Sequence, residues 1–353
     1  MKRIFIGIAL LAAIDCEAQD SATQSKPVIS GSIDAYYRYN FANPKSGTTN
    51  NLTSFTNSQN SFELGMAGIR ADHSSGKVSG TIDLGFGRRA EEFSYNDGDT
   101  DNNRNGFLSL SNIKQLYISY SPSQRLKFTA GKWGTHIGYE MVDAYLNRNY
   151  SMSYLFSYGP FFHTGIKADI STAGKTAMMA GIANPTDYST TTRPAKFIIG
   201  QLSTATANDK LKAYLNYQGG NYATGSRLDQ LDLVLSGAIS SRLSVAYNGT
   251  VQFRNPQSGP SGNWWGSALY INYDPAANCG FTLRGEYVSD ADGMLGLDSK
   301  ILALTLSNNI RLGSLTIIPE LRYDQATETL FEKNNGNPSK STFTGLLAAV
   351  YRF

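Results

Sequence analysis

The chain ends with Thr342-Phe343-Thr344-Gly345-Leu346-Leu347-Ala348-Ala349-Val350-Tyr351-Arg352-Phe353. Successive side chains of a strand point to opposite faces. One face of this segment is therefore apolar and carries Phe343, Leu347, Ala349, Tyr351 and Phe353. Tyr351 and Phe353 stand where a transmembrane barrel has an aromatic girdle. The segment predicts a final strand that turns one face toward lipid.

The same two-residue alternation recurs along the chain and predicts sixteen strands, with fourteen or eighteen as the alternatives. The expected ranges are 27–41, 60–72, 76–90, 112–121, 125–134, 162–171, 175–185, 195–206, 210–219, 227–239, 242–254, 264–274, 279–290, 297–312, 314–325 and 342–353.

The connections between these strands alternate between tight turns and long polar loops, and both ends of the chain lie on the tight-turn side. This pattern is typical of an outer-membrane barrel, with short periplasmic turns and long extracellular loops. The barrel has to close, because hydrocarbon offers no partner to an open strand edge. A β-sandwich would alternate too, but with an apolar inner face. We therefore expect an all-β, antiparallel, up-and-down transmembrane barrel.

The amino terminus predicts export. Lys2 and Arg3 precede an apolar run over 4–14, and a small-residue cleavage site follows before Gln19. We expect a signal peptide at 1–18, a short periplasmic segment at 19–26 and a barrel over 27–353. Cleavage leaves Cys279 as the one cysteine, so no disulfide and no cysteine-based metal site is expected. Lysine and arginine are scattered, which argues against nucleic-acid binding.

Several strands separate an apolar from a polar face. In 242–254, Leu243, Tyr247 and Phe253 alternate with Ser244 and Gln252. Arginine or lysine facing lipid at the bilayer centre costs about 2–4 kcal/mol, so the polar faces must point into the lumen. Sixteen strands enclose enough space for an aqueous channel.

Two short motifs suggest chemistry. Residues 85–90 fit a dinucleotide-binding string, but that fingerprint requires a helix after the strand, and a polar loop is expected here. Residues 97–106 resemble the start of a calcium loop, with Asn112 where the bidentate glutamate belongs. A divalent-cation site there stays open, and we expect no metal and no cofactor elsewhere.

Segment 135–161 is longer than a surface loop needs to be and is rich in aromatic residues. Exposed rings would be costly in water, whereas a loop folded into the lumen can bury them against the wall. We expect such an inward fold, with a cap on top of the barrel as the alternative. His163 with Ser153 or Ser157 would be the pair that an outer-membrane lipase needs, although the spacing does not require them to meet.

Five stretches resemble the putative porin-2 family of outer-membrane β-barrels: GRRAEEFSYND (87–97), GYE (138–140), NRNYSMSY (147–154), FSYGPFFHTG (156–165) and WWGSALY (264–270). The resemblance extends through nearly all of the mature chain. It implies a barrel with a porin-like role and supplies no catalytic residues.

Taken together, these patterns predict no enzyme but a passive diffusion channel in the bacterial outer membrane, for small hydrophilic solutes selected by size and charge. The expected constriction consists of Glu140, Asp143, Arg148, Tyr150, Tyr154 and His163. The expected pore wall carries Arg38, Asp83, Arg89, Lys127, Lys167, Arg284 and Glu286. Tyr351 and Phe353 resemble the signal that the barrel-assembly machinery recognises. A plugged barrel acting as a surface receptor or structural partner and, third, a lipase-type enzyme are the alternatives. Solute, ion preference, pore radius and oligomeric state stay open.

Overall fold

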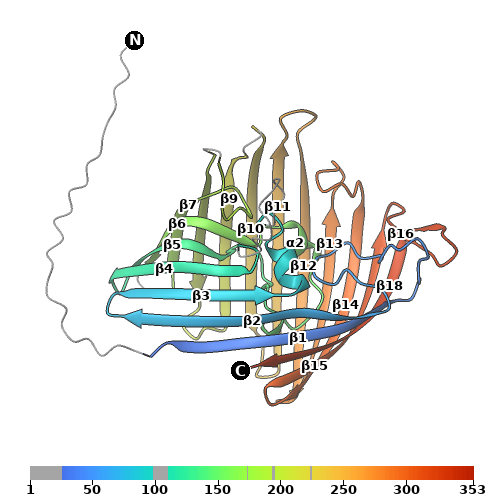
Figure 1. Cartoon of the computed structure of the whole chain (residues 1–353), viewed down its shortest axis with the longest axis horizontal. Helices are drawn as coiled ribbons and strands as arrows, with labels where there is room; N and C mark the ends of the chain where they lie inside the picture. The colour runs from blue at the N-terminus through green and yellow to red at the C-terminus, as the bar shows by residue number, and fades with distance from the viewer. Residues whose placement is uncertain (1–25, 98–109, 173, 193–194, 223–224) are drawn as a thin grey trace, which may run out of the picture.

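The computed structural model describes residues 26–97, 110–172, 174–192, 195–222 and 225–353. Within them sixteen strands form one closed antiparallel barrel, which confirms the predicted fold. The barrel strands are β1 Val28–Asn40, β2 Ser61–Ser75, β3 Val78–Phe86, β4 Ile113–Ser123, β5 Leu126–Gly134, β6 Phe162–Ser171, β7 Ala177–Ala183, β8 Phe197–Ala205, β9 Leu211–Asn221, β10 Arg227–Ala238, β11 Leu243–Asn255, β12 Gly262–Ala276, β13 Cys279–Ser289, β14 Lys300–Leu312, β15 Leu315–Ala326 and β18 Ser341–Arg352. In Figure 1 the strands of the N-terminal wall cross those of the C-terminal wall, as tilted strands on opposite sides of a barrel do.

The barrel closes where its first and last strands meet. β1 pairs with β18 in antiparallel register, with Ile33 opposite Tyr351 and Tyr37 opposite Leu347. Gly31 and Phe353 exchange both backbone hydrogen bonds at 3.0 Å, so the final residue of the chain takes part in the seam. No open strand edge is left between these two strands.

One predicted strand is too long. The segment expected as 76–90 ends at Phe86, and α1, Arg88–Phe93, follows it. Gly87 has φ of 110°, a conformation that glycine adopts readily and that breaks the strand. The expectation of a polar loop directly after residue 90 was therefore wrong. The dinucleotide fingerprint still fails, because it belongs to parallel βαβ units and β3 lies between two antiparallel neighbours.

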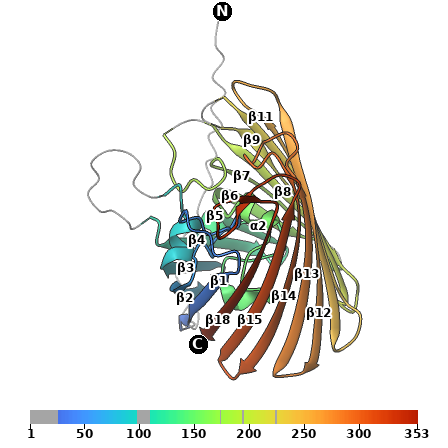
Figure 2. The same ribbon diagram turned by 90° about the vertical axis from the view of Figure 1, so that its right-hand side faces the viewer.

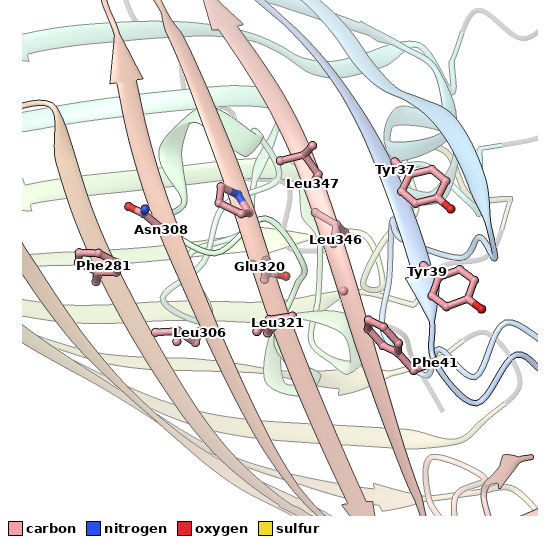
Figure 3. A pocket seen from close by; sticks show the side chains of 12 residues that line it. Tyr37, Tyr39, Phe41, Phe281, Leu306, Asn308, Glu320, Leu321, Leu346 and Leu347 are labelled. Carbon is pink, nitrogen blue, oxygen red and sulfur yellow. The ribbon is translucent and has the colours of Figure 1, made fainter.

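The outer face of the barrel is apolar and exposed. Phe62 and Leu64 of β2 keep 88% and 80% of their surface accessible. A hollow of about 500 Å³ lies on this face. Figure 3 shows residues that line it, among them Tyr39 of β1, Leu321 of β15 and Leu347 of β18. Most of its lining points away from the lumen, so this hollow faces the surroundings of the barrel and not its interior.

The shorter elements lie in the long connections. They are η1 Ala144–Leu146, α2 Tyr154–Tyr158 and a small hairpin of β16 Phe331–Glu332 with β17 Pro338–Ser339. No helix in the described ranges has the length and apolar character to cross a bilayer. α2 contacts β11, β12 and β13, and Figure 2 shows it between the walls.

Candidate functional site

Segment 135–161, called the inner loop below, runs through the interior from the long-loop end to the short-turn end and back. At its lower tip, Arg148 forms an ion pair with Asp274 at 2.7 Å, two residues before the end of β12. The ring of Tyr145 lies 5.0 Å below the guanidinium of Arg352, the last residue of β18. Asn147 closes the tip by bonding both the N–H and the C=O of Met141. The inner loop thus spans the lumen.

Arg284 of β13 binds the inner loop in the middle of the barrel. Its side chain is fully buried. Nη1 donates to Oε1 of Glu140 at 2.7 Å and to the carbonyl of Ser151 at 2.7 Å. Nε lies 2.8 Å from Oε1 of Glu286, a charge contact without hydrogen-bond alignment. A single wall arginine therefore holds the outgoing limb of the inner loop through Glu140 and the returning limb through Ser151, next to the wall carboxylate of Glu286.

The returning limb of the inner loop is anchored through Tyr150. Glu320 of β15 accepts hydrogen bonds from the backbone N–H of Tyr150 at 2.8 Å and of Ser151 at 3.1 Å. The Tyr150 hydroxyl donates to Asp34 of β1 at 2.5 Å. Burial without partners would be costly for these carboxylates, and the inner loop supplies the partners.

Tyr154 forms a second anchor at the start of α2. Its N–H donates to Glu286 at 2.7 Å, and its hydroxyl donates to Asp324 of β15 at 2.9 Å. The guanidinium of Arg322 stacks 5.0 Å from its ring. Ser153, the N-cap, accepts from the N–H of Phe156 and thereby begins the helix.

His163 lies at the root of the inner loop and does not contact either candidate serine. Its Nε2 is 3.2 Å from Oγ1 of Thr135, and its ring is 5.0 Å from that of His136. Ser157 instead donates to the carbonyl of Ser153. The pair that a lipase-type site would need is therefore not formed.

Arg89 was expected on a wall strand, but the structure places it in α1. From there it donates to the carbonyls of Val142 at 3.2 Å and Tyr150 at 3.3 Å. Arg89 therefore holds the inner loop from the side of another loop. Its assignment to the wall followed from the overlong strand prediction and was wrong.

The remaining predicted residues serve three different contacts. Asp83 and Asp143 share Lys114, at 3.1 and 2.5 Å. Arg38 donates to the carbonyls of Thr49 and Ser58 and so holds the 41–60 loop. The other two predicted wall lysines lie beside one carboxylate, with Lys127 3.9 Å and Lys167 3.3 Å from Asp169.

Two hollows meet at Tyr139, which lines both together with Asn272. The first, about 120 Å³, is also lined by Glu140, Arg148 and Asn149. The second, about 180 Å³, lies toward the short-turn end and is also lined by Lys210, Lys212 and Ser244. Of the six predicted constriction residues, Glu140 and Arg148 line a hollow here. Asp143, Tyr150, Tyr154 and His163 are buried within the protein.

Sequence reasoning missed residues that share one property, a charged side chain in the inward phase of a strand: Asp34, Lys114, Asp274, Glu320, Arg322 and Asp324. Each of them lies on the polar, inward-facing side of its strand, so the two-residue alternation of the sequence could have identified them.

No group of three histidine, cysteine or acidic side chains that could hold a metal occurs among the described residues. The proposed calcium loop at 97–106 falls outside them except for Asp97, which pairs with Lys132 at 2.7 Å. The expected signal peptide at 1–18 and most of the segment at 19–26 fall outside them as well.

The family model described as putative β-barrel porin-2, OmpL-like, matches residues 28–353. No curated protein matches the sequence significantly. Similar solved structures include in-vitro folded OmpT of Vibrio cholerae in its trimer form, with a TM-score of 0.63 and 10% identity over 93% of this chain and 99% of that one. An anion-selective porin from Comamonas acidovorans gives 0.61 and 13% over 93% and 99%. The channel DcaP of Acinetobacter baumannii gives 0.59 and 12% over 95% and 99%. At these identities the likeness shows the fold alone.

Proposed function

Because the chain belongs to the putative β-barrel porin-2, OmpL-like family of outer-membrane porin barrels, we propose that it is a diffusion channel for small hydrophilic solutes. In this proposal the inner loop is the constriction. The observation that carries it is the pair of hollows that share Tyr139 and Asn272, one at the short-turn end and the other beside Glu140 and Arg148. Charges of both signs at this depth would select solutes by size and charge.

Single-channel recording tests the proposal. A variant that lacks residues 139–158 should insert into planar bilayers and show a larger unit conductance than the wild type, because the obstacle in the lumen is gone. A matched control removes residues 334–336, the exposed tip of the β16–β17 hairpin, and should leave the conductance unchanged. Equal conductance of wild type and the 139–158 deletion would contradict the proposal.

A second function, a plugged barrel that serves as a surface receptor or structural partner, is favoured by one observation. Inward side chains of the middle strands, among them Asn216, Gln218, Thr282 and Ser307, are almost fully buried. The same recordings separate the two functions. A folded wild type without conductance steps, next to a conducting deletion variant, would support the plugged barrel.

A further inference from the structure

Two lysines line the hollow at the short-turn end. Lys210 directly precedes β9 and Lys212 is its second residue, and both are exposed. In the part of the chain that the structure describes, no ion pair engages either ammonium group. Tyr139, Ser244 and Asn272 add uncharged polar groups to the lining, and Asp209 adds one carboxylate.

The nearby carboxylates are already neutralised by other cations. Asp209, the carboxylate in the lining of the hollow, pairs with Lys175 at 2.7 Å. Asp274 is shared by Arg148 at 2.7 Å and Arg311 at 2.9 Å. The hollow therefore keeps an excess of positive charge.

The adjoining hollow continues this positive path. Its carboxylate, Glu140, is paired with Arg284 at 2.7 Å. Arg148 lies on its lining, so the second hollow adds a guanidinium to the two ammonium groups of the first. The amide of Asn272, shared by both hollows, is held by Thr282, whose hydroxyl donates to its Oδ1 at 2.9 Å.

From this arrangement we propose that the hollow of Lys210 and Lys212 is a binding subsite for small anions, of the class of chloride, inorganic phosphate and short carboxylates. Cationic side chains along a pore favour anions. As a consequence the channel passes anions in preference to cations. The consequence rests on the proposed diffusion function, whereas the subsite itself does not.

Reversal potentials in a KCl gradient test the selectivity. Each lysine-to-glutamate exchange changes the fixed charge by two units. For an ion that passes roughly 7 Å from the exchanged side chains, at a Debye length of about 10 Å, the two exchanges together should lower the chloride-to-potassium permeability ratio at least about fivefold. The test variant is Lys210→Glu/Lys212→Glu. The control is Lys77→Glu, an exposed lysine in the β2–β3 turn at the same end, which should leave the ratio nearly unchanged.

A binding measurement keeps the subsite testable without conductance. Inorganic phosphate at millimolar concentration should slow acylation of Lys210 and Lys212 by an amine reagent at least about threefold, measured by mass spectrometry on the folded full chain. Lys77 should react at the same rate with and without phosphate. Two results would overturn the inference. One is a double variant that conducts with an unchanged permeability ratio. The other is an effect of phosphate on the acylation rate that is the same for all three lysines. Absence of steps together with phosphate protection would overturn the channel function and leave the subsite supported.

Discussion

Replacing Arg284 by methionine should release the inner loop while the barrel stays closed. Methionine fills a similar length but cannot pair with Glu140, which loses its cation inside the protein, or with Glu286, which keeps only Arg322 at 3.8 Å. The carbonyl of Ser151 loses its donor as well. β13 keeps its backbone pairing with β12 and β14, so the wall itself has no reason to open.

The size of the effect follows from burial. Removing one partner of a buried ion pair costs about 3–5 kcal/mol, because the other charge is left uncompensated. If that cost falls on the docked state of the inner loop, its docking equilibrium shifts by about a thousandfold, at 1.4 kcal/mol for each factor of ten. Arg311→Met is the control, because Arg311 is one-third exposed and an exposed pair contributes about 1 kcal/mol or less.

Two measurements check this outcome. Limited proteolysis of the folded barrel should cut Arg284→Met within 135–161 and leave the wild type and Arg311→Met intact. Planar-bilayer recordings should show a larger or noisier conductance for Arg284→Met alone. Unchanged proteolysis and conductance in a folded Arg284→Met barrel would refute the view that this contact network holds the inner loop.

Three further outcomes are expected. Deleting Phe353 removes its two hydrogen bonds to Gly31, so the yield of folded barrel in an assembly assay should fall, whereas the conductance of barrels that do form should match the wild type. Leu347→Arg places a charge on the outer face, and denaturant unfolding in lipid vesicles should report a loss of about 2–4 kcal/mol; no loss would contradict the orientation of β18. Burial raises the pKa of Asp187 to about 7, although the carboxylate accepts hydrogen bonds from the N–H groups of Phe161 and Phe162. Its stabilisation is therefore complete below its ordinary pKa near 4 and is lost as pH rises through 7. Proteolysis of the loop joining β7 and β8 should accelerate from pH 5 to pH 8 in the wild type and lose this dependence in Asp187→Asn.

Strand positions could be predicted from sequence because period-two alternation is local. The expected range 162–171 coincides with β6, and 227–239 differs from β10 by one residue. The same method failed at Gly87, since the alternation says nothing about a positive φ. The aromatic content of 135–161 indicated burial for the same local reason.

The contacts of the inner loop could not be predicted in this way. Arg284 and Glu140 are 144 positions apart, and their pairing depends on the depth at which the inner loop crosses β13. The polar inward faces indicated a lumen but not how much of it the inner loop fills. The depth at which the inner loop crosses the barrel is a property of the folded structure. It decides whether an inward charge lines a hollow or anchors the inner loop.

The reach of the inner loop constrains the order of assembly. Three of its anchors are Asp274, Arg284 and Glu320, which lie 126 to 170 residues further along the chain, and Tyr145 at its tip packs against Arg352, the last residue of β18. None of these anchors exists as a wall until the C-terminal half of the barrel has joined the sheet. A half-built barrel can therefore hold the segment only through N-terminal contacts such as Lys114 with Asp143 and Arg89 with Val142, while Glu140 and Arg148 still lack their partners. Sealing β1 against β18 and docking of the inner loop then become late steps of the same event, and a barrel that closes too early would trap the segment outside.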